Sequence, residues 1–442
     1  MSTPRYGVIS LRLVLLLVFT LASSNAALAA ICTWTGLGTS NRWSNAQNWT
    51  ACNGGIPVNG DSLSFQTNAA QRVNENDIPG LRVVSIFVQD RGQASAPFEI
   101  SGLALTVSTR VHAVKAIGST GAGTILRLPL AMHQANGEIF VEDSGTTLTI
   151  TGRITGPPIG PNFGTMHLSG MGTLVLANAT NTWQHVTMSD VTVRIGVAGA
   201  WPDNSELLMI RAATLVLNDL DETIGTLAGA SNTIVGPRIQ LNGRATLTVQ
   251  QLFSEIFEGT ISGTGSLVKD GGGRLTMADP LAGPTPNTYT GTTTVSAGEL
   301  ELIKNGIVRH KGSHQLGTQS DVTIEANGLL DLNGFLNTIG SLSGSGAIQL
   351  GTGELSIGAN GKSTTFSGSI TGMSRPAGVD AIVKVGTGTL TLTGQSAVGG
   401  PVAIAAGRLV VDGFLDSNDV RVAAAGTLSG TGTLRNLSLI HI

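Results

Sequence analysis

Charged and aromatic residues are scarce in this chain of 442 residues. Asp, Glu, Lys and Arg together make up 12% of the sequence, and Phe, Trp and Tyr make up 4%. The charged share is about half of that in an average soluble domain. A compact globule of this length needs more charge on its surface and more large side chains in its core. The composition therefore argues against a compact globular domain.

Glycine is abundant instead, with 60 residues, which is roughly twice its usual share. Hydrophobic residues reach 41%, so the chain can bury a core and does not resemble a disordered segment. In a solenoid each coil buries small aliphatic side chains against its neighbours and turns on Gly and Asn. The composition favours such an extended solenoid.

Positive charge is not concentrated anywhere along the chain. The net charge is −3 and the pI is about 6.2, so an attraction to nucleic acid is excluded. Beyond residue 29 no apolar run approaches the roughly 18 residues that cross a bilayer. We expect no transmembrane segment in this chain.

The first residues resemble an export signal. Arg5 and Arg12 provide a positive start, residues 13–22 (LVLLLVFTLA) are apolar, and Ala27-Leu28-Ala29 has the small-x-small pattern of a cleavage site. We predict a signal peptide over residues 1–29 and export of the mature chain.

Only two cysteines occur, Cys32 and Cys52, and both follow the predicted cleavage site. In an oxidising compartment a lone close pair is most simply a disulfide, and a metal site would need further ligands. Trp34, Trp43 and Trp49 lie in the same stretch. We predict a Trp-rich cap with a disulfide over residues 30–65; the alternative is that these rings stack against glycans.

A degenerate repeat dominates the rest of the chain. One copy reads GTGSLVKDGGGRLTM at residues 263–277 and closes with TTTVSAGELEL at 292–302. A second reads IVKVGTGTLTLTG at 382–394 and closes with VAIAAGRLVV at 402–411, and a weaker copy begins at 168–183. Short alternating strands separated by Gly turns, with no helical periodicity, predict an all-β solenoid over residues 66–436.

These motifs resemble the autotransporter-associated β-strand repeat of bacterial secreted passenger proteins. The resemblance implies a parallel β-helix, and the preference of parallel crossovers predicts that it is right-handed. It also implies a secreted or surface-displayed passenger of a type V secretion system in a Gram-negative bacterium, acting as a scaffold or adhesin. Its expected partners are host-surface or glycan ligands and an outer-membrane translocator barrel.

Catalytic motifs are incomplete. Gly60-Asp61-Ser62-Leu63 is similar to the nucleophile block of GDSL esterases, but no Asp-x-x-His supplies a base. His310 and His314 have i, i+4 spacing, but Gly312 places them on a loop. We therefore expect no catalytic residue, no metal site, no cofactor and no enzymatic activity.

One enzymatic alternative remains open at this stage, a β-helical lyase or glycoside hydrolase that acts on polysaccharides. It would require several carboxylates on one groove. The acidic residues lie in separate segments, although stacking of coils can bring distant ones together.

Two Pro-rich stretches, residues 156–162 and 279–288, cannot continue a strand ladder and are expected to form loops that carry binding specificity. Residues 437–442 (LSLIHI) read as a translated sequencing adapter, so we regard them as an artefact and expect the native chain to continue.

Overall fold

The computed structural model describes residues 29–90, 96–115, 123–133, 136–158, 164–230, 235–278, 287–303, 316–375, 378–435 and 439–441. Almost all of the predicted signal peptide, the His310/His314 pair and most of both Pro-rich stretches lie outside these residues. Within them, the one helical element is a 3-10 turn, η1 (Ala46–Asn48). In this part of the chain no helix is long and apolar enough to span a membrane.

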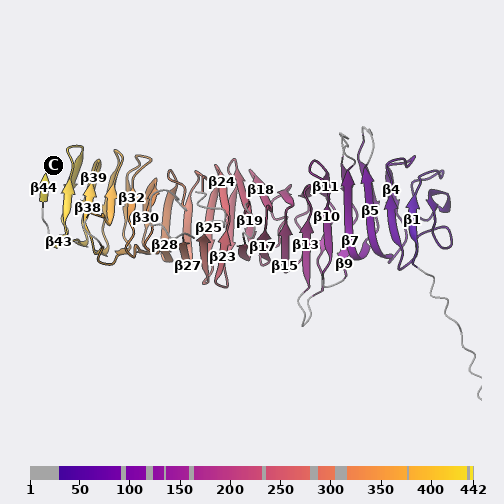
Figure 1. Ribbon diagram of the computed structural model, residues 1–442, viewed down its shortest axis with the longest axis horizontal. Coiled ribbons are helices and arrows are strands. Elements are labelled where there is room, and N and C mark those ends of the chain that lie inside the picture. The colour runs from indigo at the N-terminus through magenta and orange to yellow at the C-terminus, as the bar shows by residue number, and fades with distance from the viewer. Residues whose placement is uncertain are drawn as a thin grey trace, which may run out of the picture.

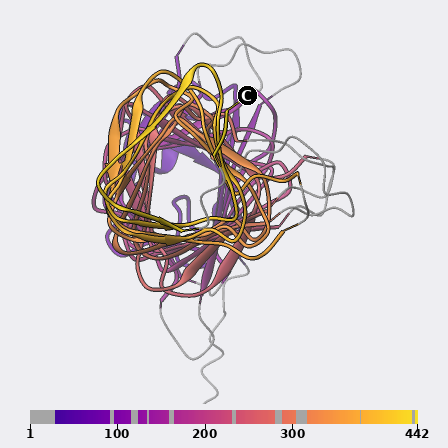
Figure 2. The same cartoon turned by 90° about the vertical axis from the view of Figure 1, so that its left-hand side faces the viewer.

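The predicted all-β parallel solenoid is confirmed. Successive coils stack in chain order along a rod (Figure 1), and the strands surround a common axis when the rod is viewed from its end (Figure 2). Every strand pairing is parallel except the one between β1 and β2 (Trp49–Thr50) among the described residues. The right-handed sense of the helix stays a prediction.

The strands form three faces. The first face is a ladder of β1 (Ile31–Trp34), β3 (Ser62–Phe65), β5 (Arg82–Asp90), β7 (Leu105–Lys115), β10 (Glu138–Val141), β13 (Thr165–Ser169), β15 (His185–Ser189), β17 (Glu206–Ile210), β20 (Thr226–Ala230), β23 (Glu255–Glu258), β26 (Arg274–Ala278), β27 (Thr293–Ile303), β28 (Asp321–Asp331), β31 (Ala347–Gln349), β34 (Ser369–Thr371), β37 (Gln395–Ala397), β40 (Phe414–Asp416) and β43 (Thr433–Arg435).

The second face has two sheets. One contains β4 (Val73–Asn76), β6 (Phe98–Gly102), β8 (Thr124–Leu126), β11 (Thr147–Ile150), β14 (Thr173–Leu176), β16 (Thr192–Ile195), β18 (Thr214–Asn218), β21 (Arg238–Asn242) and β24 (Thr260–Gly263). The other contains β29 (Asn337–Ile339), β32 (Leu355–Ile357), β35 (Ile382–Lys384), β38 (Val402–Ile404), β41 (Val420–Val422) and β44 (Leu439–His441).

The third face is joined to the first by the long strands β7, β27 and β28. It contains β9 (Leu130–Met132), β12 (Ile154–Thr155), β19 (Glu222–Ile224), β22 (Thr246–Gln250), β25 (Ser266–Asp270), β30 (Ser341–Gly344), β33 (Thr364–Phe366), β36 (Thr389–Leu392), β39 (Gly407–Val411) and β42 (Gly426–Ser429).

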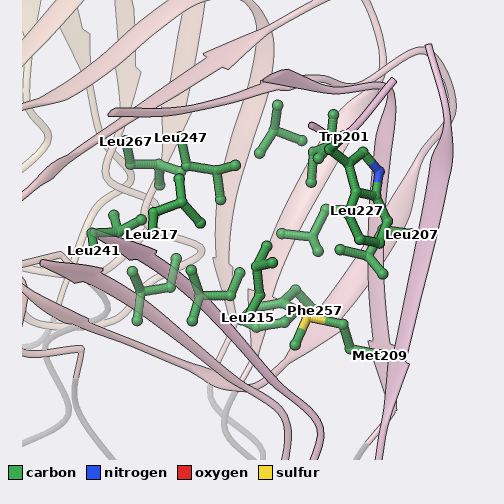
Figure 3. Packing of buried hydrophobic residues seen from close by; sticks show 14 of the residues in the cluster. Trp201, Leu207, Met209, Leu215, Leu217, Leu227, Leu241, Leu247, Phe257 and Leu267 are labelled. Carbon is green, nitrogen blue, oxygen red and sulfur yellow. The ribbon is translucent and has the colours of Figure 1, made fainter. Parts of the chain in front are cut away.

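The core follows from the alternation of side chains along each strand. In β22, Leu247 and Val249 are buried while the flanking Thr and Gln side chains point outward. Leu247 pairs with Leu267 of the next coil, and Figure 3 shows the two side chains next to each other. Each coil thus continues an apolar column inside the rod, which is why small aliphatic residues suffice.

Gly229 leaves space for the aromatic ring of Phe257 in the core. Gly229 lies between Met209 and Phe257 in the first face. A Cβ atom at Gly229 would lie 2.7 Å from Cδ2 of Phe257. The missing side chain therefore makes room for one of the few aromatic rings of the core.

The Trp-rich segment lies at the N-terminal end of the described rod. The short strand β2 pairs antiparallel with β1, so it covers the edge of the first coil. The Cys32–Cys52 disulfide joins β1 to the segment that follows β2, with a Cα–Cα distance of 4.5 Å, and the predicted pairing is confirmed.

Candidate functional site

Two buried lysines mark the two strong copies of the repeat. Lys269 points inward from β25, where its neighbours in the column are Val249 and Val295, and it is fully buried. Its Nζ donates to the carbonyl oxygens of Asp270 (2.8 Å), Gly271 (2.9 Å) and Ala297 (3.0 Å). The ammonium group thus joins its own turn to the following coil, and we call this arrangement a lysine clasp.

The second copy repeats this geometry. Lys384 lies on β35 between Ile357 and Ile404, and only 1% of it is exposed. Its Nζ donates to the carbonyl oxygens of Val385 (2.6 Å), Gly386 (3.0 Å) and Ala406 (3.3 Å). The spacing of the repeat therefore encodes a specific contact between adjacent coils.

Burial governs the ionisation of both lysines. It lowers the pKa of Lys269 to about 8, although the nearby Asp270 and Glu299 carboxylates oppose the shift. It also lowers the pKa of Lys384. A buried ammonium group is tolerated only when its donors are satisfied, and the three carbonyls of each clasp fulfil that condition.

The tryptophans of the cap are internal. Trp34, Trp43 and Trp49 are at most 6% exposed, and their rings pack around Phe65. Each indole N–H has an acceptor, namely the carbonyl oxygen of Gln71, Oδ1 of Asn74 and the carbonyl oxygen of Trp43, respectively. This burial supports a role as a cap rather than as a glycan-stacking platform, and the cap remains a proposal.

The esterase-like motif has a structural explanation. Asp61 is buried and its carboxylate accepts the N–H groups of Ala30 (2.8 Å) and Val58 (3.0 Å). The Ser62 hydroxyl accepts a hydrogen bond from Ser85 at 3.0 Å, and no histidine bonds to it in the described part of the chain. The motif anchors the start of β3.

Three carboxylates do converge, which the sequence analysis missed. The carboxylate oxygens of Glu299, Glu301 and Asp331 lie within 4.8 Å of one another. Arg274 contacts Glu299 at 2.9 Å and Glu301 at 3.4 Å, and the Thr276 hydroxyl donates to Glu301. The two glutamates have the i, i+2 spacing of one strand face, a signal that the sequence contained. Arg274 and Thr276 thus bond to the two glutamates, and the Asp331 carboxylate accepts the N–H of Asn333.

Besides a hollow of about 480 Å³ that includes Arg110 and His112, two surface hollows among the described residues are large enough for a ligand. One, of about 510 Å³, lies beside the acidic cluster and contains Asp331, Gln349 and Thr371. The other, of about 560 Å³, lies between corners of three coils and is lined by residues 155–158, 182–184 and 202–204. We call the second hollow the Trp183 groove. It includes Pro157 and Pro158 of the first Pro-rich stretch, which the sequence analysis expected to carry specificity.

The two segments that contain the lysine clasps match a known repeat family. The model of the passenger-associated-transport-repeat family matches residues 267–302 and 382–411, and each match contains one lysine clasp. The weaker copy of the repeat is not among the matched residues. The described fold is a parallel β-solenoid, and two of its segments are similar to the passenger-associated-transport repeat.

The chain is also a homologue of a particular adhesin. It is 29% identical over 355 residues to the adhesin BmaC autotransporter of Brucella suis biovar 1 (strain 1330). The alignment covers 76% of this chain but only 9% of the adhesin, so the chain spans a small part of that protein's length. No solved structure matches the chain.

Proposed function

We propose that this chain is part of an exported autotransporter passenger that acts as a non-enzymatic adhesive scaffold on a Gram-negative cell surface. The observation that carries the proposal is the similarity to an autotransporter adhesin, which extends over 76% of the chain. The proposed partners are an outer-membrane translocator and host-surface or glycan ligands.

The architecture suits this role. Residues 1–29 serve as the signal peptide, residues 30–65 as the cap and residues 66–436 as the rod. A rod of stacked coils holds binding surfaces away from the membrane, and each coil contacts mainly its neighbours, so folding can proceed coil by coil as the chain emerges.

The test is adhesion by the folded chain alone. Beads coated with the purified chain should bind to epithelial cells or to extracellular matrix, and beads coated with the heat-denatured chain should not. Equal binding by the two kinds of bead, or binding by neither, would contradict the adhesive role. Release of sugar fragments from host polysaccharides by the purified chain would contradict a non-enzymatic role.

Export can be tested separately from adhesion. The N-terminus of the protein recovered from the cell surface should begin at Ala30, directly after the Ala27-Leu28-Ala29 pattern. A surface protein that begins at Met1 would contradict the predicted signal peptide.

A further inference from the structure

The Trp183 groove is built from equivalent corners of three successive coils. Its lining comprises residues 155–158, 182–184 and 202–204, and its volume is about 560 Å³. Pockets of roughly 300–1,000 Å³ hold small ligands of several rings. The hollow therefore has the size of a site for an oligosaccharide or a short peptide.

Backbone and buried side-chain contacts fix the three corners. Thr155 forms a β-bridge with Thr182, and the N–H of Gly156 donates to the carbonyl oxygen of Thr182 at 2.6 Å. The buried Asn181 side chain accepts from the N–H of Ile154 at 2.8 Å and donates to the carbonyl oxygen of Ala200 at 2.9 Å. These contacts hold the backbone of the three corners in place.

The wall of the groove contains a buried donor without an acceptor. Trp183 is 6% exposed, and its ring meets Trp201 edge-on at a centroid distance of 5.4 Å. Trp201 is fully buried in the core (Figure 3). The indole N–H groups of Trp183 and Trp201 both have no hydrogen-bond partner in the described part of the chain, whereas Trp34, Trp43 and Trp49 each have one. The nitrogen atom itself is buried, so Trp183 contributes its ring to the wall of the groove and can report on ligand binding there.

The rim is polar and nearly balanced in charge. Gln184, Asp203 and Asn204 are exposed, and their side chains make no hydrogen bond among the described residues. Asp203 is the one charged lining residue, and Arg153 reaches the rim at Thr182, 3.5 Å from its hydroxyl. This balance favours a neutral ligand over a strongly anionic or cationic one.

We infer that the Trp183 groove binds a neutral oligosaccharide, and this inference rests on the proposed adhesive function. Gln184 and Asn204 offer both donors and acceptors, and the exposed Asp203 carboxylate offers acceptors. Sugar hydroxyl groups supply both, and the apolar C–H surface of a sugar ring can pack against Pro158 and Pro202. A polyproline segment has carbonyl acceptors but no N–H donor, so it can accept from Gln184 and Asn204 but cannot donate to Asp203.

The test uses the full chain labelled with ¹⁵N in its tryptophan side chains. Neutral trisaccharides (maltotriose, cellotriose, chitotriose, mannotriose) are titrated, with a sialylated trisaccharide and a decaproline peptide as comparisons. At least one neutral sugar should shift the indole signal of Trp183, assigned with the Trp183→Phe variant. No shift with any neutral sugar, or a shift only with the sialylated sugar or the peptide, would overturn the inference.

Rim variants separate the groove from other surfaces. Gln184→Ala and Asn204→Ala should each weaken the affinity by about tenfold, which corresponds to roughly 1.4 kcal/mol. Gln349→Ala, which changes the same residue type in the other hollow, should leave the affinity unchanged. Equal affinity in all three variants would place the sugar elsewhere and refute the assignment.

The bead assay distinguishes this inference from the adhesive role. If beads with the Gln184→Ala/Asn204→Ala double variant still adhere, and adhere also to periodate-treated cells, the groove is not the adhesive site. The adhesive role of the chain would still be supported. Binding of a neutral sugar by the groove with no adhesion to any cell or matrix would support the groove and contradict the adhesive role.

Discussion

Lys269 and Gly298 meet across two adjacent coils. The Nζ atom of Lys269 donates to the carbonyl oxygen of Ala297, and a Cβ atom at Gly298 would lie 2.9 Å from Nζ. Gly298 has a φ of 67°, a conformation that glycine adopts without strain. Lys384 and Gly407 have the same relationship, with a φ of 69° and the same 2.9 Å. The lysine of one half of the repeat and the glycine of its closing half therefore form one structural unit.

Removal of a clasp should destabilise the rod locally. Lys269→Met leaves three buried carbonyl oxygens without their ammonium donor, so we expect a loss of about 2 kcal/mol in the free energy of unfolding. Lys384→Met should give a similar loss. Urea unfolding, with hydrogen exchange of β25 and β27 to locate the effect, measures it.

The control for both clasps is Lys362→Met. Lys362 is exposed and pairs with Asp321 at 2.6 Å, and such surface pairs contribute about 0–1 kcal/mol. If the clasp variants unfold at the same urea concentration as Lys362→Met, the lysine clasp contributes no stability.

Glu222 should give the rod a pH-dependent stability. Burial raises the pKa of Glu222 to about 7, and Asp203 adds to the rise, although the backbone N–H groups of Trp201 and Gly199 oppose it. The folded protein then holds a proton that the unfolded chain releases near 4.5. This contribution to stability is complete below about pH 4.5 and is lost as the pH rises through about 7.

The measurement compares the wild type with Glu222→Gln between these pH values. The free energy of unfolding of the wild type, relative to the variant, should fall by at most about 3 kcal/mol as the pH rises. Parallel pH profiles of the two proteins would show that Glu222 does not titrate in this range.

Gly229→Ala should destabilise the coil that contains Phe257. The added methyl group would lie 2.7 Å from the Phe257 ring, and overpacking of a core typically costs about 1–3 kcal/mol. Gly272→Ala is the matched control, because a Cβ atom there would meet nothing within 4 Å. Thermal unfolding should separate the two variants, and equal melting temperatures would contradict the assigned role of Gly229.

Loss of the disulfide should loosen the cap. The Cys32→Ser/Cys52→Ser variant opens a link between residues separated by 20 positions, which should cost about 3 kcal/mol. Limited proteolysis should then cleave the N-terminal coils first, while hydrogen exchange of β36 and β39 stays unchanged. Equal protease resistance of both proteins would show that β2 and the buried tryptophans hold the cap without the disulfide.

Strand positions were largely predictable because alternation and Gly turns are local signals. Residues 147–150 (TLTI) and 238–241 (RIQL) alternate between polar and apolar side chains, and they lie in β11 and β21. Residues 322–324 (VTI) also alternate, but their strand, β28, extends to Asp331. That extension depends on pairing with β27 and β31, which local sequence does not reveal.

The sequence by itself determined the fold class, the disulfide partners and the repeat, because each depends on local spacing or on a lone pair of cysteines. Only the tertiary structure decided what lies together across coils. It showed that the Lys269 ammonium group bonds to a carbonyl oxygen of the next coil. It also showed that Asp331 lies close to Glu299 and Glu301. It also joined the corners of three coils into the Trp183 groove. The register between successive coils fixes these contacts, and that register depends on loop lengths and packing rather than on any single segment.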